Sequence, residues 1–315
     1  MTGYNPTFLG SVLPLPKIKN AADVLPLTTG EKQLDYPHFS IAMSKARRLA
    51  YFTAVNIDAS LWKDNTREGS WRNDPRLTAN QQWGTPLYTA LQSDFDKGHL
   101  VKREDPEWGS QSQSEEAGKS TFQFPNCAPQ HSHLNKEIWQ ELENNILHTG
   151  ALGEGLQVSV FTGPVLSAKD PAFVTKVKGE TVLLPLLFWK VVAWKKSDGK
   201  LYAVGFLMSQ EKFLLDGGII ALPARPAGRV TGALRKEDIF QHLPFRDGKT
   251  YQVSLEEIEK LAGIKFTGWT KVQKPFTATT ALRATARPKR STSKGTATRA
   301  LLKRTSFIRI AGMSL

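Results

Sequence analysis

The feature that most restricts how this chain can fold is a proline-containing loop that leads directly into an amphipathic helix. Pro129 lacks an amide proton and would clash with a preceding helical turn, so the helix must begin after it. Trp139, Leu142 and Ile146 then recur at helical spacing and predict the buried face of that helix. The polar residue Asn135 therefore falls at the start of the helix, close to the loop.

A second polar stretch lies upstream, from Asp94 to Arg103, and places His99 directly after Gly98. Taken alone, such a histidine is more often a loop residue without a chemical role. A histidine at a strand end, paired across a loop with an asparagine at a helix start, has the geometry of a ββα metal finger. In that motif one hairpin and one helix hold a base and a cation against the same phosphate.

These two stretches together carry a specific resemblance. The residues involved are Asp96, Lys97, Gly98, His99, Asn126, Pro129, Gln130, Asn135, Trp139 and Glu143. The pattern resembles the core of the DNA/RNA non-specific endonuclease family, and the likeness extends from about Leu34 to Thr267. It implies an α+β fold with a mainly antiparallel central sheet flanked by helices and a ββα-metal finger active site. We predict an N-terminal arm at 1–34, an endonuclease domain at 35–267 and a flexible basic tail at 268–315.

The resemblance also implies the chemistry, which is phosphodiester hydrolysis with one divalent cation. His99 would be the general base, since a neutral imidazole with an ordinary pKa of about 6.5 accepts a proton from water near neutral pH. Asn135 would bind Mg²⁺ directly, with Mn²⁺ able to substitute, because this hard cation prefers oxygen ligands. Glu143 lies eight residues further on, a rise of about 12 Å along an ideal helix. We therefore assign Glu143 to the outer shell of the ion, and Asn126 to a phosphate or water contact.

Three neighbouring positions carry expectations of their own. Gly98 would allow close approach of backbone or substrate, and Asp96 would hold the turn or orient the imidazole. The family usually has arginine at the position of Lys97; lysine keeps the charge but loses the planar two-pronged donor. A phosphate-contacting arginine is also implied upstream, where spacing favours Arg67 over Arg72. Two solvated arginines are the alternative.

The cysteine and the remaining histidines give weaker signals. Cys127 is alone in the chain, which excludes an internal disulfide, and a packed, inert thiol is favoured over a reactive one. His131 and His133 lack two of the four ligands that a structural zinc ion requires. We expect them to be solvated or near the substrate.

The net charge of +13 is concentrated at the C-terminal end. Residues 265–315 hold 12 Lys and Arg and no acidic residue, which leaves 42 − 12 = 30 basic against 29 acidic residues in 1–264. Such a tail can bind phosphates without reading sequence, by releasing counterions. A membrane-surface tail and a protein-docking tail are the alternatives.

The rest of the chain predicts mainly antiparallel sheet. Alternation predicts a hairpin of 39–45 and 47–58, with Leu49, Tyr51, Thr53, Val55 and Ile57 on one face. Further strands are expected at 156–162, 186–194 and 201–208. Ser254 and Glu257 resemble a capping box that starts a helix ending near Gly263. The segments 61–93 and 103–120 are predicted as long loops, the second one mobile.

The leading functional hypothesis is a Mg²⁺-dependent, largely sequence-non-specific endonuclease acting on DNA and on RNA, whose relatives leave a 5′-phosphate. The alternative is a catalytically weak or inactive nucleic-acid-binding protein that uses the basic tail. A toxic or defensive role within a larger system would leave the chemistry unchanged. The sequence contains no evident export signal or membrane-spanning run, so a cytoplasmic protein is expected, with delivery to another compartment or cell left open. A homodimer and an inhibitor or docking partner are also left open.

Overall fold

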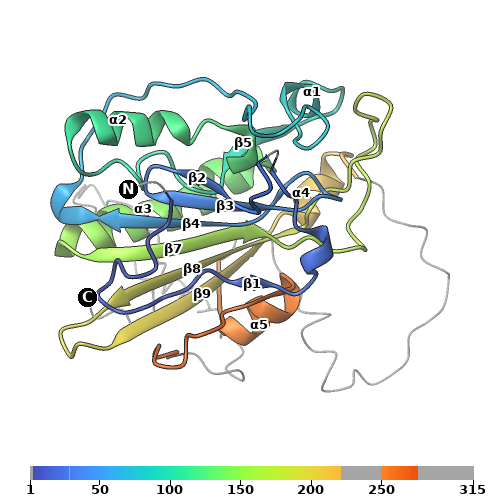
Figure 1. Ribbon diagram of the computed structural model, residues 1–315. Coiled ribbons are helices and arrows are strands. Elements are labelled where there is room, and N and C mark those ends of the chain that lie inside the picture. The colour runs from blue at the N-terminus through green and yellow to red at the C-terminus, as the bar shows by residue number, and fades with distance from the viewer. Residues whose placement is uncertain (1–2, 28, 221–249, 276–315) are drawn as a thin grey trace, which may run out of the picture.

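A seven-stranded antiparallel sheet forms the centre of the molecule (Figure 1). The computed structural model describes residues 3–27, 29–220 and 250–275. The spatial order of the large sheet is β10-β9-β8-β7-β4-β3-β2, and two small sheets pair β5 with β6 and β1 with β11. The strands are β1 (Lys17–Ile18), β2 (Leu34–Tyr36), β3 (Phe39–Met43), β4 (Ala50–Asp58), β5 (Phe95–His99), β6 (Cys127–His131), β7 (Gln157–Pro164), β8 (Leu187–Lys195), β9 (Leu201–Ser209), β10 (Tyr251–Val253) and β11 (Ile264–Lys265).

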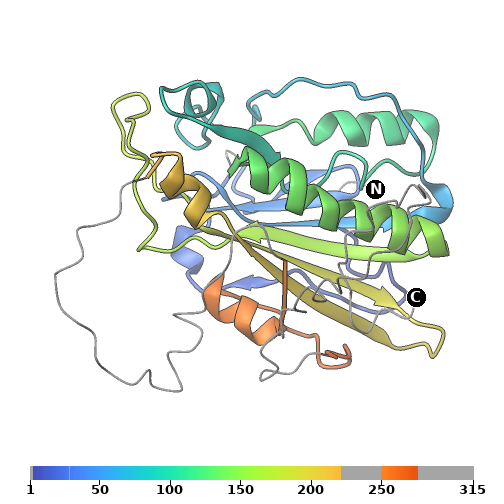
Figure 2. The same cartoon turned by 180° about the vertical axis from the view of Figure 1, so that it is seen from behind.

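Helices pack on both sides of this sheet, so the predicted α+β class with a mainly antiparallel sheet is confirmed. One long helix is built from π-helical η4, α3 and π-helical η5 in direct succession (Figure 2). The helical segments are η1 (Ala21–Asp23), η2 (Ala59–Leu61), α1 (Thr85–Tyr88), α2 (Gln111–Ser120), η3 (Phe124–Asn126), η4 (Leu134–Trp139), α3 (Gln140–Asn144), η5 (Asn145–Leu152), α4 (Glu211–Asp216) and α5 (Leu255–Leu261).

Each face of the sheet is covered by its own apolar layer. The long helix buries Trp139, Leu142 and Ile146 against one face, which confirms the predicted core face of this helix. On the other face, α5 packs together with the N-terminal arm, whose Tyr4 and Leu13 are buried there. Because both faces are covered, the strands are apolar at successive positions and not only at alternate ones.

A third apolar cluster supports the small β5–β6 hairpin. It joins Phe95 and Cys127 of the hairpin to Tyr88 of α1 and to Phe124, and it continues into the loop between β7 and β8 through Phe173. This cluster fixes the hairpin at the end of the large sheet. His99 ends β5 of this hairpin, and Asn135 lies in the first part of the long helix.

The predicted strands are observed, but two local expectations are wrong. β4 does not place its odd-numbered residues on one face, because Tyr51 packs with the cluster under α5 whereas Val55 and Ile57 pack under the long helix. The register of β3 and β4 shifts between Ala42 and Met43, which accounts for the change of face.

The segment 103–120 is also not a mobile loop throughout. Its second half forms α2, which begins with a complete capping box between Ser110 and Gln113. The Ser-x-x-Gln spacing is a helix-start signal present in the sequence, and it outweighs the polar composition of the segment. The predicted helix after Ser254 is observed, and the Ser254 hydroxyl accepts from the Glu257 amide at 3.2 Å, which is the first of the two hydrogen bonds of the predicted capping box.

Two further expectations concern the chain as a whole. Among the described helices none is long and apolar enough to cross a membrane. The predicted basic tail lies outside the described residues from position 276 onward.

Candidate active site

The β5–β6 hairpin and the long helix bring the predicted residues to one place. In the hairpin, His99 pairs with Cys127 and Lys97 pairs with Pro129. Pro129 is tolerated because this ribbon has two strands only, so its missing amide proton interrupts no inner ladder. The chain leaves β6 at His131 and enters the helix at once, which places Asn135 in the first helical turn.

A cavity of ≈ 540 Å³ opens between the hairpin and the helix. His99, Asn135, Glu143 and Arg67 all contribute to its wall, whereas Asn126 does not. The complete lining is Arg67, Trp71, Tyr88, Phe95, Asp96, Lys97, His99, Lys102, Arg103, Glu104, Asn135, Lys136, Gln140 and Glu143. Basic side chains outnumber acidic ones on this wall, as a site for a polyanion requires.

His99 lies against two aromatic rings at the edge of the cavity. Its ring centroid is 4.5 Å from that of Trp71 and 4.9 Å from that of Phe122, which meets it edge-on. Burial, followed by the nearby charges of Arg67 and Arg103, lowers the pKa of His99 from 6.5 to about 3. Its Nε2 atom has no hydrogen-bond partner among the described residues. The imidazole is therefore neutral near pH 7, and its Nε2 atom is buried without a protein partner in the described part of the chain.

Asn135 is oriented by a carboxylate. Its Nδ2 donates to Asp96 Oδ2 at 3.1 Å, and Lys136 Nζ holds the other Asp96 oxygen at 3.1 Å. This contact turns the amide so that Oδ1 is left for a ligand. Asp96 thus orients the asparagine of the helix, whereas orientation of the imidazole was one of the two roles expected for it.

Glu143 lies deeper on the same helix and is paired with a buried lysine. Lys190 of β8 is 1% exposed at its side chain, and its Nζ reaches Glu143 Oε1 at 3.3 Å and Thr162 Oγ1 at 2.9 Å. Burial raises the pKa of Glu143, and the charge of Lys190 acts in the opposite direction. The pair fixes a carboxylate at the back of the cavity.

These groups fit a hydrated divalent cation. The described residues contain no cluster of three or more His, Cys, Asp or Glu side chains suited to a metal. A site built on one amide oxygen, with a carboxylate available to metal-bound water, needs no such cluster. Mg²⁺ commonly keeps several of its waters when bound to protein, which matches Asn135 as a direct ligand and Glu143 as a hydrogen-bond partner of bound water.

The predicted role of Asn126 does not agree with its position. Asn126 is fully buried, and its Oδ1 accepts from the Val101 amide at 2.9 Å. Its Nδ2 donates to the carbonyls of Val101 and Thr121, both at 3.0 Å. Both amide protons and the carbonyl oxygen of this side chain are bonded to backbone groups, so we correct the assignment: Asn126 ties the chain after His99 to the end of α2 and does not face the cavity.

The two candidate arginines are separated by the structure. Arg67 lines the His99 cavity, and its guanidinium lies 5.6 Å over the Phe122 ring. Arg72 lines a different cavity, and its guanidinium lies beside the side chain of Gln123. The position of Arg67 agrees with the spacing argument. Lys97 also lines the His99 cavity.

Several groups at the site were missed by sequence reasoning. Trp71 and Phe122 come from separate loops, and nothing in their spacing relates them to His99. Lys190 did leave a signal, because a single lysine stands within the apolar run from Phe188 to Val192. Lone charges in buried strands are rare unless paired.

The side chains of Cys127, His131 and His133 pack against other side chains outside the His99 cavity. The Cys127 thiol is buried and lies 3.0 Å from the Tyr88 hydroxyl, and burial raises its pKa, so it is a packed thiol with little thiolate. His131 and His133 stack on each other and on Phe213, with centroids 5.2 to 5.7 Å apart. No third metal-binding side chain joins them among the described residues.

The hairpin, the helix and the cavity between them define a protein of the ββα-finger class. The family model described as "DNA/RNA non-specific endonuclease" matches residues 18–273. The chain belongs to the DNA/RNA non-specific endonuclease family, whose members are typically metal-dependent.

Individual relatives are consistent with this membership. An uncharacterized protein, y4fB, of Sinorhizobium fredii is 32% identical over 278 residues, which are 84% of this chain and 38% of that protein. A nuclease of a Nostoc species is 23% identical and covers 72% of this chain and 70% of its own length. Human mitochondrial endonuclease G is 30% identical over 149 residues, 45% of this chain and 47% of that protein. This chain therefore spans well under half of y4fB, the first of these relatives.

A solved structure shows the same fold. In the crystal structure of the EndoG/EndoGI complex, which concerns the mechanism of EndoG inhibition, a chain superimposes with a TM-score of 0.54 at 17% identity. The match covers 78% of this chain and 90% of that one. The likeness supports the fold of the sheet and finger.

Proposed function

We propose that this protein is a metal-dependent endonuclease that hydrolyses phosphodiester bonds of DNA and of RNA with little sequence preference. The observation that carries the proposal is the single cavity that holds His99, Asn135, Glu143 and a cationic wall. Membership of a nuclease family supports the substrate class. A reader of specific sequences would need an element suited to a groove, whereas this cavity offers charges that suit any backbone phosphate.

His99 acts as the general base in this proposal. Its neutral imidazole accepts the proton of the attacking water, and Trp71 and Phe122 hold the ring in place. Arg67 and Lys97 attract the phosphate and stabilise the negative charge that grows on it. A histidine pKa well below 7 keeps the base available at neutral pH but makes it weak. Charge stabilisation at the phosphate must therefore supply much of the rate.

Asn135 would hold the Mg²⁺ ion through Oδ1, with Asp96 fixing the amide and Glu143 accepting from metal-bound water. When bound, the ion supplies Lewis-acid stabilisation of the phosphate and of the leaving oxygen. One neutral protein ligand leaves the charge of the ion nearly undiminished. We expect weak binding of the metal without nucleic acid.

The test is cleavage of supercoiled plasmid and of single-stranded RNA, with Mg²⁺ or with excess EDTA. The wild type is expected to nick and degrade both only with the metal, and His99→Ala is expected to lose at least about a hundredfold in rate, the order typical for a general base. Binding without cleavage by the wild type in Mg²⁺ and in Mn²⁺ would instead support a non-catalytic nucleic-acid-binding protein.

The role of Asp96 gives a matched second test. Asp96→Ala frees the Asn135 amide and should raise the Mg²⁺ concentration needed for half-maximal rate by about tenfold, the usual effect of removing the partner that orients a ligand. Lys212→Ala, which removes an exposed charge on α4, is the control. An Asp96→Ala enzyme with an unchanged Mg²⁺ requirement would contradict the orienting role.

A further inference from the structure

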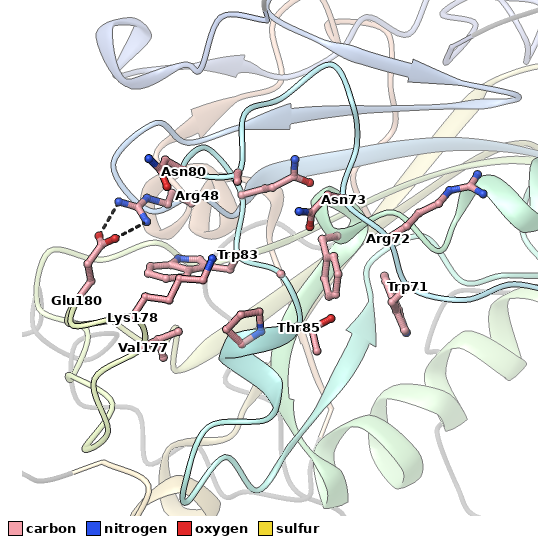
Figure 3. Close-up of a pocket in the computed structure, with 15 residues that line it drawn as sticks. Arg48, Trp71, Arg72, Asn73, Asn80, Trp83, Thr85, Val177, Lys178 and Glu180 are labelled. Carbon is pink, nitrogen blue, oxygen red and sulfur yellow. Dashed lines mark hydrogen bonds and ion pairs between the residues drawn. The ribbon is translucent and has the colours of Figure 1, made fainter.

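A second cavity, drawn in Figure 3, has a volume of ≈ 300 Å³. Trp71 lines both this cavity and the cavity of His99. Four parts of the chain form the wall: Arg48 from the turn before β4, residues 71–86 leading into α1, Phe124 of η3, and residues 177–180 from the loop between β7 and β8. The two sites therefore form adjoining parts of one surface.

One wall of this cavity is organised by a charged and aromatic contact. The guanidinium of Arg48 lies 4.7 Å over the Trp83 ring, and it donates to the Glu180 carboxylate at 2.6 and 3.1 Å. These contacts, drawn in Figure 3, fix the rim between two segments far apart in the sequence. Arg48 is therefore a positioning residue for the wall, and its charge is largely used by Glu180.

The remaining charges of the lining are positive. Lys178 is exposed on the same rim, and its backbone has φ +51°, an unusual conformation for a residue other than glycine. Arg72 is exposed at the other end, beyond Trp71, and the amide side chain of Asn73 lies between the two ends (Figure 3). Cations on both sides of an aromatic wall, with an exposed amide between them, suit a nucleotide: charge for the phosphate and rings for the sugar and base.

The distance to His99 fits a continuous nucleic acid strand. The ring of Trp71 is 4.5 Å from that of His99 and 5.8 Å from that of Phe124, which lines the second cavity. The two distances together set an upper limit of about 10 Å on the separation of the His99 and Phe124 rings, which is at most about three nucleotides at the 3.4 Å rise of one strand of a duplex. A strand whose phosphate lies at His99 would thus reach this cavity within a few nucleotides.

We propose that the second cavity is a subsite for a nucleotide that flanks the scissile bond. The backbone phosphate on one side of this nucleotide contacts Lys178 and the phosphate on its other side contacts Arg72, and its sugar and base lie against the wall formed by Trp71 and Trp83. The inference rests on the proposed nuclease function of the His99 cavity. With this subsite the protein would contact several successive nucleotides of one strand, and its contacts to their phosphates would not depend on base identity.

The experiment measures binding separately from cleavage. Fluorescence anisotropy in EDTA, with His99→Ala as the background, would compare a single-stranded oligonucleotide long enough to span both cavities with a dinucleotide. Lys178→Glu is expected to weaken binding of the long strand by about tenfold, the order expected for one charged phosphate contact. It should also make the dependence of log Kd on log salt shallower by about one. The dinucleotide fits within one cavity and should show a much smaller effect.

Lys260→Glu provides the matched control. Lys260 is exposed on α5, on the other side of the sheet (Figure 1), and its replacement changes the net charge by the same amount. Equal binding by the Lys178→Glu and Lys260→Glu proteins would overturn the subsite. Tighter binding of an acidic peptide than of the oligonucleotide, lost in Lys178→Glu, would also overturn it by assigning the cavity to a protein partner.

The two proposals fail in different ways. Loss of long-strand binding in Lys178→Glu, together with a wild type that cleaves nothing, would retain the subsite and reject the nuclease. Cleavage by the wild type, with Lys178→Glu indistinguishable from Lys260→Glu, would reject the subsite alone.

Discussion

His99 shows how the surroundings of one residue set its chemistry. The sequence suggests a histidine near its ordinary pKa, flanked by polar residues. The structure places the ring against Trp71 and Phe122 with two arginines nearby. Burial, the charge of Arg67 and the charge of Arg103 each disfavour the protonated imidazolium. The base is consequently neutral over the whole physiological range. Substrate phosphate, which brings negative charge, would raise its pKa toward that of ordinary histidine.

The same shift predicts how stability depends on pH. In the folded protein His99 stays neutral down to about pH 3, whereas the unfolded chain binds the proton near pH 6.5. Unfolding therefore takes up a proton in this window, so the contribution is fully present above pH 6.5 and is lost as the pH falls toward 3. Between pH 7 and pH 5 the wild type should lose up to about 2 kcal/mol relative to His99→Gln, which does not titrate. Urea unfolding in EDTA at both pH values measures this difference, and parallel losses in the two proteins would contradict it.

At the residue scale, the sequence predicts which residues belong to the site better than it predicts which groups their side chains contact. His99, Asn135 and Glu143 could be singled out because the motif around them resembles that of the endonuclease family, and Pro129 fixes the start of the helix that carries Asn135. Asn126 was misplaced because the pattern shows an asparagine but not where its amide points. Its three hydrogen bonds go to backbone groups that only the folded chain brings near.

At the scale of elements, Gly98 is needed for the β5–β6 hairpin rather than for the substrate. A Cβ atom at this position would lie 2.0 Å from Gln130 Oε1 and 2.7 Å from Gln130 Cγ. Gln130 is fully buried on the neighbouring strand and has little room to move. The close approach expected for Gly98 is therefore made by a side chain of the protein.

Gly98→Ala should lower the free energy of unfolding by about 1–3 kcal/mol through overpacking. In a Gln130→Ala background the same change should cost much less, because the clashing atoms are gone. Gly153→Ala, at a helix end with an ordinary φ and only a contact at 3.4 Å, serves as the control and should be nearly neutral. Denaturant unfolding of the four proteins of the cycle gives the coupling. Additive effects would contradict the assigned contact.

The ion pair between β8 and the long helix predicts a larger effect. Lys190→Met keeps the approximate volume but leaves the Glu143 carboxylate buried without its cation, which should destabilise the protein by about 3 kcal/mol or more. Glu143→Gln combined with Lys190→Met should recover part of the loss. Lys195→Met, at the exposed end of the same strand, is the matched control. A Lys190→Met protein as stable as the control would show that the pair adds nothing to folding.

At the scale of the whole molecule, alternation and turn signals were sufficient to predict the strands, since β7, β8 and β9 lie within one or two residues of their expected bounds. They could not predict what covers the sheet. The arm at 3–27 has little periodicity, yet Tyr4 and Leu13 fill one apolar layer, because that layer is completed by residues from both ends of the described chain. Long-range pairing of this kind leaves no local pattern.

The predicted basic tail gives the last test, which concerns the chain beyond the catalytic body. Truncation after Lys274 removes 9 of the 12 basic residues of 265–315 and no acidic residue, and it leaves β11 and Trp269 in place. If the tail neutralises phosphates, the truncated protein should bind nucleic acid more weakly and with a shallower dependence on salt, by about 0.9 in the slope of log K against log salt for each lost contact with duplex DNA. Its unfolding temperature should be unchanged.

A second variant separates charge from chain length. In it the tail is kept at full length with every Lys and Arg after Lys274 replaced by Gln. If counterion release drives tail binding, this protein should behave as the truncated one does. A salt slope equal to that of the wild type would reject the electrostatic role. A full-length neutral tail that binds as tightly as the wild type, next to a weakened truncation, would assign the contribution to contacts other than charge. The protein truncated after Lys274 keeps 42 − 9 = 33 basic and 29 acidic residues, so we expect any steep salt dependence that survives truncation to arise from local clusters of basic side chains, such as the cationic lining of the His99 cavity and of the second cavity beside it.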